Sequence, residues 1–257
     1  MTRGVYIAAT GMLAEEAAQQ VIAQNLANAS TTGYKEDIPV FRSFDENLVS
    51  FADSSGKMLD TLGSLGNGAA FDAAVTDFGQ GGMQQTGNPL DIAMTGNAFI
   101  GIATANGTCY SRDGALTLSR AGVLVQAASG LPVLDDKGGQ IQLSNKMTNV
   151  HIDADGVIKS DAGVAGRIGL FAISMAQRPR KIGGNLIQTT IAPPIVDATR
   201  DPGAGVRSGF LETSNVNIVR EMVTMIAGLR AYEANQKTLQ SHDSLEEKSV
   251  NTVGRVG

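Results

Sequence analysis

The sequence has no tryptophan, one cysteine, two histidines and seven prolines among its 257 residues. The single cysteine, Cys109, cannot form a disulfide within the chain, so cysteine usage indicates neither an oxidising nor a reducing compartment. His151 and His242 are far apart in the sequence and make a poor basis for a metal site. No apolar run approaches the roughly 20 residues that a membrane-spanning helix needs. We therefore expect no metal, no other cofactor and no membrane insertion.

Neither sign of charge is concentrated in the chain. The net charge is -5 and 42% of the residues are hydrophobic, which indicates a soluble globular protein and offers no electrostatic case for nucleic acid. The one dense basic run, residues 178–181, is expected to be a solvated loop. The N-terminus lacks the apolar core and cleavage site of a secretory signal, so we expect no cleaved signal peptide.

Motifs of catalysis are missing as well. The sequence contains no GxSxG, P-loop or HExxH pattern, and Cys109 has no His or Asp at a suggestive spacing. Residues 151–156 resemble the start of a calcium loop but lack the remaining ligand spacing and the distal Glu, so we predict a hairpin turn there. The residues therefore give no candidate catalytic site.

The stretch from Leu211 to Val253 predicts a long amphipathic helix. Ser214, Asn215 and Asn217 are all residue types that cap helix N-termini, and the sequence does not decide among them. The apolar residues that follow recur at intervals of three and four: Ile218, Met222, Met225, Leu229, Tyr232 and Leu239, with Val216, Val219, Val223 and Ile226 beside them. Such a helix would be roughly 50 Å long, so it needs a partner along its length.

A second, shorter helix is predicted from about Gly4 to Asn28. It contains no proline and much alanine, and its larger apolar residues Val5, Met12, Ile22 and Leu26 share one face. Asn, Ser and Thr residues follow, and then Gly33, which can adopt the positive φ of a chain reversing out of a helix.

The residues between the predicted helices form two segments with different sequence patterns. Residues 36–88 show no sustained period and contain turn clusters such as Ser54-Ser55-Gly56, which indicates an extended, Gly-rich arm. Residues 89–210 contain short apolar runs separated by turns such as Asn106-Gly107, which predicts an all-β domain.

The predicted fold class is therefore α+β, with paired, coiled-coil-like terminal helices and an inserted β domain. The predicted organisation has three parts: a discontinuous helical domain of residues 1–35 plus 211–257, an arm of residues 36–88, and a β-rich outer domain of residues 89–210.

Several motifs in this order resemble those of the bacterial flagellar axial proteins, the rod and hook components. Each is weak alone, and their combination is specific. The matching segments are Asn25-Leu26-Ala27-Asn28 with Gly33-Tyr34-Lys35, Thr86-Gly87-Asn88-Pro89-Leu90-Asp91, Tyr110-Ser111-Arg112-Asp113-Gly114, the box from Leu211 to Asn217, and Arg230-Ala231-Tyr232-Glu233.

The resemblance implies a structural subunit that is not an enzyme and that polymerises helically into the rod, the shaft that carries torque from motor to hook. Its partners would be copies of itself, other rod and hook proteins, and the flagellar type III export apparatus, and its location the periplasm-spanning basal body. The proximal rod subunit fits best, with the distal rod or hook subunit as alternatives. A β-domain enzyme or ligand-binding module with dimerising helices is the alternative from another class.

The assembly hypothesis assigns particular residues. The Asn and Ser residues are either helix caps or groups that also bond backbone atoms of neighbouring subunits, and Gly33 meets a backbone requirement. The apolar residues form a core either within one subunit or between subunits. The candidate interface comprises Asn25, Leu26, Asn28, Gly33, Tyr34, Ser214, Asn215, Val216, Asn217, Met222, Met225, Ile226, Leu229 and Tyr232.

Overall fold

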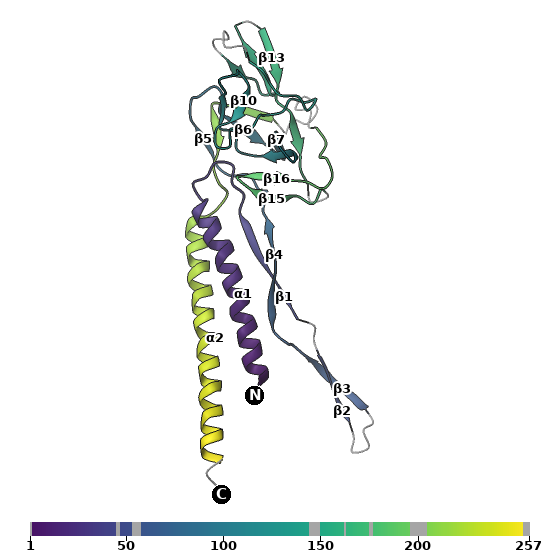
Figure 1. Cartoon of the computed structure of the whole chain (residues 1–257), viewed down its shortest axis with the longest axis vertical. Coiled ribbons are helices and arrows are strands. Elements are labelled where there is room, and N and C mark those ends of the chain that lie inside the picture. Colours follow the sequence, from purple (N-terminus) through teal and green to yellow (C-terminus); the bar gives the residue numbers. More distant parts are fainter. Residues whose placement is uncertain are drawn as a thin grey trace. The chain divides into compact units, whose positions relative to one another are not determined.

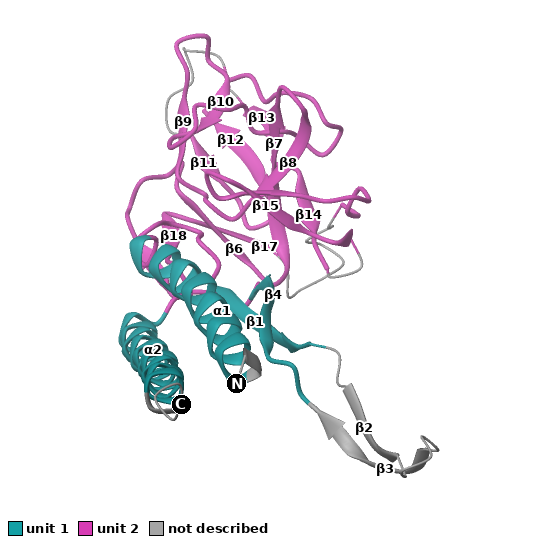
Figure 2. Cartoon of the chain, turned by 60° about the horizontal axis from the view of Figure 1, so that its bottom comes forward, with its two compact units in different colours: residues 1–27, 37–77, 217–257 teal, residues 28–36, 78–216 magenta. Residues whose placement is uncertain are grey.

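The computed structural model describes residues 2–44, 47–52, 58–143, 150–161, 163–174, 177–195 and 205–253. The chain divides into two compact units, coloured separately in Figure 2. Unit 1 contains Met1–Ala27, Asp37–Asp77 and Asn217–Gly257, and unit 2 contains Asn28–Glu36 and Phe78–Val216. The helical unit therefore also holds residues 37–77, which the sequence analysis assigned to a separate arm.

In its described residues, unit 1 contains two helices and four strands. Its elements are α1 (Thr2–Ala27), β1 (Asp37–Ser43), β2 (Asn47–Ala52), β3 (Met58–Leu65), β4 (Ala69–Thr76) and α2 (Ile218–Val253). The two helices lie side by side and run antiparallel (Figure 1). Gly4 near the start of α1 faces His242 near the end of α2, and Asn25 near the end of α1 bonds Glu221 in the first turn of α2.

Small residues allow α1 to pack closely. Ala8, Ala14, Ala18 and Ile22 are its buried apolar side chains. Because an alanine side chain is a single methyl group, the backbones of neighbouring elements can approach α1 closely. The helix ends at Ala27 and is followed by a turn, as the Asn, Ser and Thr residues after it predicted.

The expected arm contains paired strands. β1 pairs antiparallel with β4, in a register that sets Ile38 opposite Val75, and β2 pairs antiparallel with β3. Sequence periodicity did not indicate this pairing because β1 is exposed over most of its length on both faces, so no alternation of polar and apolar residues is required. The predicted turn at Ser54-Ser55-Gly56 lies outside the described residues.

Unit 2 is built from short strands, as the spacing of turn residues predicted. These are β5 (Met83–Gln85), β6 (Ile92–Thr95), β7 (Ala98–Thr104), β8 (Gly107–Ser111), β9 (Leu116–Leu118), β10 (Leu124–Gln126), β11 (His151–Ile152), β12 (Val157–Ser160), β13 (Gly163–Arg167), β14 (Leu170–Ala172), β15 (Arg180–Gly183), β16 (Leu186–Gln188), β17 (Gly205–Ser208) and β18 (Phe210–Glu212). Five strands form an antiparallel sheet in the order β14-β7-β8-β16-β15. A three-stranded sheet, β11-β12-β13, and three two-stranded pairs, β9 with β10, β6 with β17 and β5 with β18, complete the unit.

The five-stranded sheet packs apolar side chains on both faces. On β7, Ile100 and Ile102 enter the main core, while Phe99 enters a second cluster with Tyr110 and Phe171. Gly101 lies against the ring of Phe171, and a Cβ atom there would be 2.7 Å from that ring. Burial on both faces explains why β7 appears in the sequence as a continuous apolar run.

A cavity-forming substitution should test this core. Ile158 on β12 is fully buried in the main core. We expect Ile158→Ala to lower the free energy of unfolding of unit 2 by about 2–5 kcal/mol, because it removes buried methylene groups and leaves a void. Urea denaturation followed by hydrogen exchange of peptides from residues 78–216 would measure the loss.

The control is Val164→Ala on the neighbouring strand β13, where the side chain is 70% exposed. It should change the same free energy by no more than about 0.5 kcal/mol. Equal losses in the two variants would contradict the assignment of the core.

Candidate assembly face and linker junction

The start of α2 distinguishes the three candidate caps. Asn217 accepts a hydrogen bond on Oδ1 from the backbone nitrogen of Arg220, at 3.1 Å, and the helix begins at Ile218. Asn217 is therefore the N-cap. Ser214 instead accepts a bond from the backbone nitrogen of Val216, inside unit 2.

The face of α2 toward α1 combines polar and small residues with three half-buried apolar ones, Met225, Tyr232 and Leu239. Gln19 donates from Nε2 to the carbonyl oxygen of Met225, at 2.9 Å. Close approaches mark the rest of the contact: Gly228 faces Gln19, Gly11 faces Asn235 and Gly4 faces His242. At Gly228 a Cβ atom would lie only 2.4 Å from Nε2 of Gln19. The helices therefore pair through amides and glycines as well as through large apolar side chains.

Asn25 joins three segments of unit 1. Its Nδ2 donates to the carbonyl oxygen of Asp37 at 2.8 Å and to Oε2 of Glu221 at 3.1 Å, and its Oδ1 accepts from the backbone nitrogen of Asp37 at 3.0 Å. Asn25 is 1% exposed and Glu221 is 5% exposed. The carboxylate lies in the first turn of α2, where the helix dipole favours a negative charge. The last turn of α1, the first residue of β1 and the first turn of α2 are thereby held together.

Most of the predicted apolar stripe of α2 is exposed to solvent. Of the candidate residues, Met225 and Tyr232 are half-buried, as is Leu26 on α1. The exposed members, with exposed fractions between 45% and 71%, are Ile218, Val219, Met222, Val223, Ile226 and Leu229. We call these six residues the apolar row.

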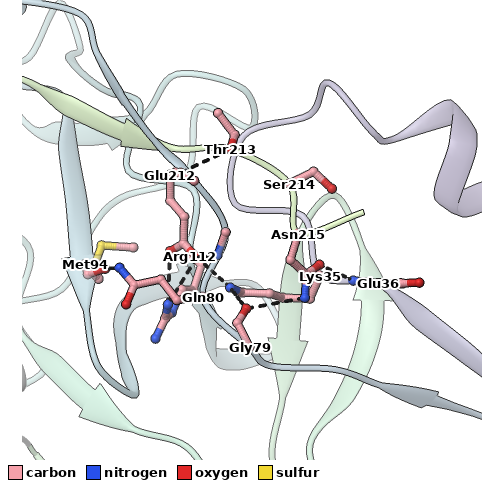
Figure 3. Close-up of polar contacts among 12 residues, drawn as sticks. Lys35, Glu36, Gly79, Gln80, Met94, Arg112, Glu212, Thr213, Ser214 and Asn215 are labelled. Carbon is pink, nitrogen blue, oxygen red and sulfur yellow. Dashed lines mark hydrogen bonds and ion pairs between the residues drawn. The ribbon is translucent and has the colours of Figure 1, made fainter. Parts of the chain in front are cut away.

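A buried ion cluster lies in unit 2, at the end of β18 (Figure 3). Oε1 of Glu212 accepts hydrogen bonds from Nζ of Lys35 at 2.6 Å and from the backbone nitrogen of Gly81 at 2.8 Å. Nη1 of Arg112 lies 3.0 Å from Oε2. All three charged side chains are at most 1% exposed, and the Arg112 guanidinium also lies over the Phe99 ring. Removing Glu212 would leave two buried cations without their shared carboxylate.

Residues 28–36 pass alongside residues 212–215 at this cluster. Gly33 donates its backbone N–H to the carbonyl oxygen of Glu212 at 2.8 Å, and Glu36 donates its backbone N–H to Oδ1 of Asn215 at 2.7 Å. Tyr34 is buried, with the Lys181 ammonium 4.2 Å from its ring centre. We call this region the linker junction, because the chain enters unit 1 at Asp37 and Asn217, just beyond it.

Two further residues complete the junction. Asn28 accepts hydrogen bonds from the backbone nitrogen and the hydroxyl of Thr31, which closes the turn after α1. Asp113 accepts a bond from the Thr32 hydroxyl at 2.8 Å. Burial raises the pKa of Asp113 above its usual range, against the opposing effect of the hydrogen bonds that it accepts.

The sequence analysis identified some of these positions and missed others. It singled out Gly33, Tyr34 and Asn215, which the fold brings together. Asn25 and Asn215 both bond backbone groups of their own chain. It did not single out Glu212 or Glu221. The sequence signal that could have identified Glu212 and Glu221 was the presence of an acidic residue within a largely apolar or cap-forming motif.

Three further features of the sequence analysis concern the turn at residues 151–156, metal ligands and membrane-spanning helices. Residues 151–156 form a hairpin turn between β11 and β12, as predicted, with Gly156 donating to the carbonyl of Asp153. Within the described ranges, no three His, Cys, Asp or Glu side chains gather as metal ligands would. Neither α1 nor α2, over its described residues, is apolar enough to span a membrane.

Comparison with known proteins gives the family. Three family models match in order: "Flagella basal body rod protein" over residues 5–35, "Flagellar hook protein FlgE/F/G D1 domain" over residues 93–160 and "Flagellar basal body rod FlgEFG protein C-terminal" over residues 207–252. The chain is 31% identical to the flagellar basal-body rod protein FlgF of Caulobacter vibrioides, over 100% of both chains. This chain belongs to the flagellar basal-body rod protein family.

Relatives of two kinds are about equally similar to this rod protein. It is 29% identical to the flagellar basal-body rod protein FlgG of Bacillus subtilis, over 98% of this chain and 99% of that protein. It is 32% identical to FlgG of Agrobacterium fabrum, over 95% and 96% of the two chains. The predictions of a structural rod subunit of the flagellar basal body, and of a protein without enzymatic activity, are confirmed by this membership.

The buried ion cluster should be essential to unit 2 of the rod protein. We expect Glu212→Ala to lower the free energy of unfolding by about 3–5 kcal/mol, because the buried Lys35 and Arg112 lose the carboxylate that they share. The measurement is urea denaturation read by hydrogen exchange of unit 2. Lys159→Ala removes an exposed ion pair with Asp153 in the same unit and should cost less than about 1 kcal/mol. The prediction fails if the two losses are alike.

Gly33 should be irreplaceable for two reasons. Its φ is +66°, and a Cβ atom there would lie 2.4 Å from the carbonyl carbon of Arg112. We expect Gly33→Ala to destabilise unit 2 by about 2–4 kcal/mol, from the left-handed backbone and the steric clash together. Gly130 has φ +68° with open space around it, so Gly130→Ala isolates the backbone cost of about 1 kcal/mol. Indistinguishable thermal unfolding midpoints for the two variants would rule out the clash.

Proposed function

We propose that this protein is the proximal rod subunit and polymerises helically through its terminal helices. The observation that carries the proposal is the apolar row of α2, whose six large side chains are about half or more exposed in the single chain. Burial contributes on the order of 25 cal/mol per Å² of apolar surface, so neighbouring copies that cover this row would be stabilised along the whole helix. Repetition over many subunits makes a stiff shaft from individually weak contacts.

The same proposal assigns the parts of the subunit to places in the shaft. The terminal helices, paired in a coiled-coil-like manner, would form the inner tube, with the apolar row between neighbouring copies. The β-rich outer domain of residues 89–210 would lie outside the tube. The four-to-three spacing of Glu221, Met225, Gly228 and Asn235 on the face of α2 toward α1 supports the coiled-coil-like arrangement.

We further propose export through the flagellar type III apparatus without a cleaved signal peptide. Helices whose apolar surface is not buried within one chain gain their full stability only on assembly. Such a subunit is suited to passage through a narrow export channel in an unfolded state.

A distal rod subunit is the second candidate, supported by the similarity to FlgG proteins over nearly the full chain. Expressing the protein in strains that lack either their own proximal or their own distal rod gene separates the two roles. Restored swimming in the strain without the proximal gene is the expected result. Rescue of the distal deletion alone would reverse the assignment.

The assembly interface is tested by placing a charge in the apolar row. We expect Met222→Asp to abolish swimming and to remove the protein from purified basal bodies, because the new carboxylate would be buried between subunits without a partner. Thermal unfolding of unit 2 should not change. The measurements are motility in soft agar and immunoblotting of purified basal bodies.

Thr224→Asp is the matched control. Thr224 is an exposed residue of the same helix, α2, but lies outside the apolar row, so this variant should still be incorporated into the rod. Normal swimming of Met222→Asp would exclude the apolar row as an interface. A defect of equal size in both variants would point instead to a general requirement of the helix.

A further inference from the structure

Helix α2 carries two adjacent faces, either of which could pack against α1. The observed contact face comprises Glu221, Gly228, Asn235 and His242. The half-buried residues Met225, Tyr232 and Leu239 lie between them at helical spacing. The neighbouring face replaces the first four with Ile218, Met222, Leu229 and Gln236 and retains the three half-buried residues. At 100° per residue, a rotation of α2 by roughly 50° about its own axis exchanges the two faces.

Hydrophobic burial alone favours the face that is not used. Three of its residues, Ile218, Met222 and Leu229, are large apolar side chains that the observed arrangement leaves about half exposed. Packing them against the alanine-rich α1 would remove their surface from water. Some other interaction must therefore select the observed rotation.

We propose that the Asn25–Glu221 and Gln19–Met225 hydrogen bonds set the rotation of α2 against α1 and so keep the apolar row outside the helix pair. Asn25 cannot follow a rotating α2, because both ends of its amide are also bonded to the backbone of Asp37. A rotation would withdraw Glu221 from this buried amide and leave polar groups without their partners. Buried polar residues that specify the register of a helix pair are the best-attested use of such groups.

Gly228 also favours the observed rotation of α2. Gly228 presents no side chain to Gln19, so the amide can reach the carbonyl oxygen of Met225 across the seam. In the rotated arrangement Leu229 would replace Gly228 opposite α1 and push the helices apart. Gln19, Asn25 and Glu221 are thus positioning residues. That the exposed row then serves neighbouring subunits rests on the proposed function, whereas the rotation itself does not.

Disulfide cross-linking of the purified full chain measures the rotation directly. In a Cys109→Ser background, the pair Gly11→Cys with Asn235→Cys reports the observed face, since Gly11 faces Asn235. The pair Gly11→Cys with Gln236→Cys reports the rotated face. We expect the first pair to cross-link at least about tenfold faster, because a disulfide needs Cα atoms within about 7 Å and Cβ atoms that point toward each other.

Replacing the polar groups should then redistribute the cross-links. The double variant Gln19→Leu, Glu221→Leu (the Leu variant) leaves Asn25 and its bonds to Asp37 in place. In it we expect the two cysteine pairs to cross-link at equal rates, or the Gln236 pair to cross-link faster. Glu221→Gln retains an oxygen that can accept from Asn25 and should preserve the preference. An undiminished preference for the Asn235 pair in the Leu variant would overturn the proposal. Cross-linking of neither pair would also overturn it, since the bonds would then be needed for pairing itself.

The two proposals fail separately. Cross-linking is measured on the purified chain and does not depend on assembly into a rod, whereas the Met222→Asp experiment reads assembly and not rotation. If Met222→Asp were incorporated normally while the cross-links behaved as expected, the rotation would stand and the role of the apolar row in assembly would fall.

Discussion

The buried amide of Asn25 is the interaction on which the helical unit depends. It bonds the first residue of β1 through both its oxygen and its nitrogen, and it bonds the Glu221 carboxylate in the first turn of α2. Because such polar contacts and the glycines lie on the contact face, the six side chains of the apolar row of α2 are not needed for pairing within the chain. They remain on its exposed side, where other subunits can cover them.

The β-rich unit has its own buried polar centre at the linker junction. Glu212 accepts bonds from Lys35 and Arg112, and its backbone carbonyl accepts from Gly33, so the segments before β1 and after β18 are held side by side. Buried ion pairs contribute little net stability compared with apolar packing of the same volume, but they penalise every arrangement that separates the partners. A subunit of a shaft that carries torque benefits from that property, because both of these linkers then leave the unit from defined positions.

The buried amide of Asn25 and the buried ion cluster around Glu212 both bear on what a rod subunit needs. A rod subunit must be stable enough to fold and must not consume its assembly surface within its own fold. Polar selection of the helix contact meets both conditions, since it specifies one arrangement and leaves apolar surface for association. The family motifs at the two ends of the chain are consistent with this, because residues from both contribute to the helix pair and to the linker junction.

The sequence by itself determined the two helices, the β-rich middle and the family, because cap residues, helical periodicity, turn dipeptides and motif order are local signals. It could not determine that Asn217 is the cap, since Ser214 and Asn215 have the same chemistry and differ only in what the fold places beside them. It gave no sign of the β1–β4 pairing, because most residues of β1 are exposed and no alternating pattern is required there. It identified the apolar row as a face of α2 but not its partner, because periodicity describes one helix and not the neighbour. The tertiary structure decided which face of α2 contacts α1, and that Lys35 and Glu212, 177 positions apart, share one buried site.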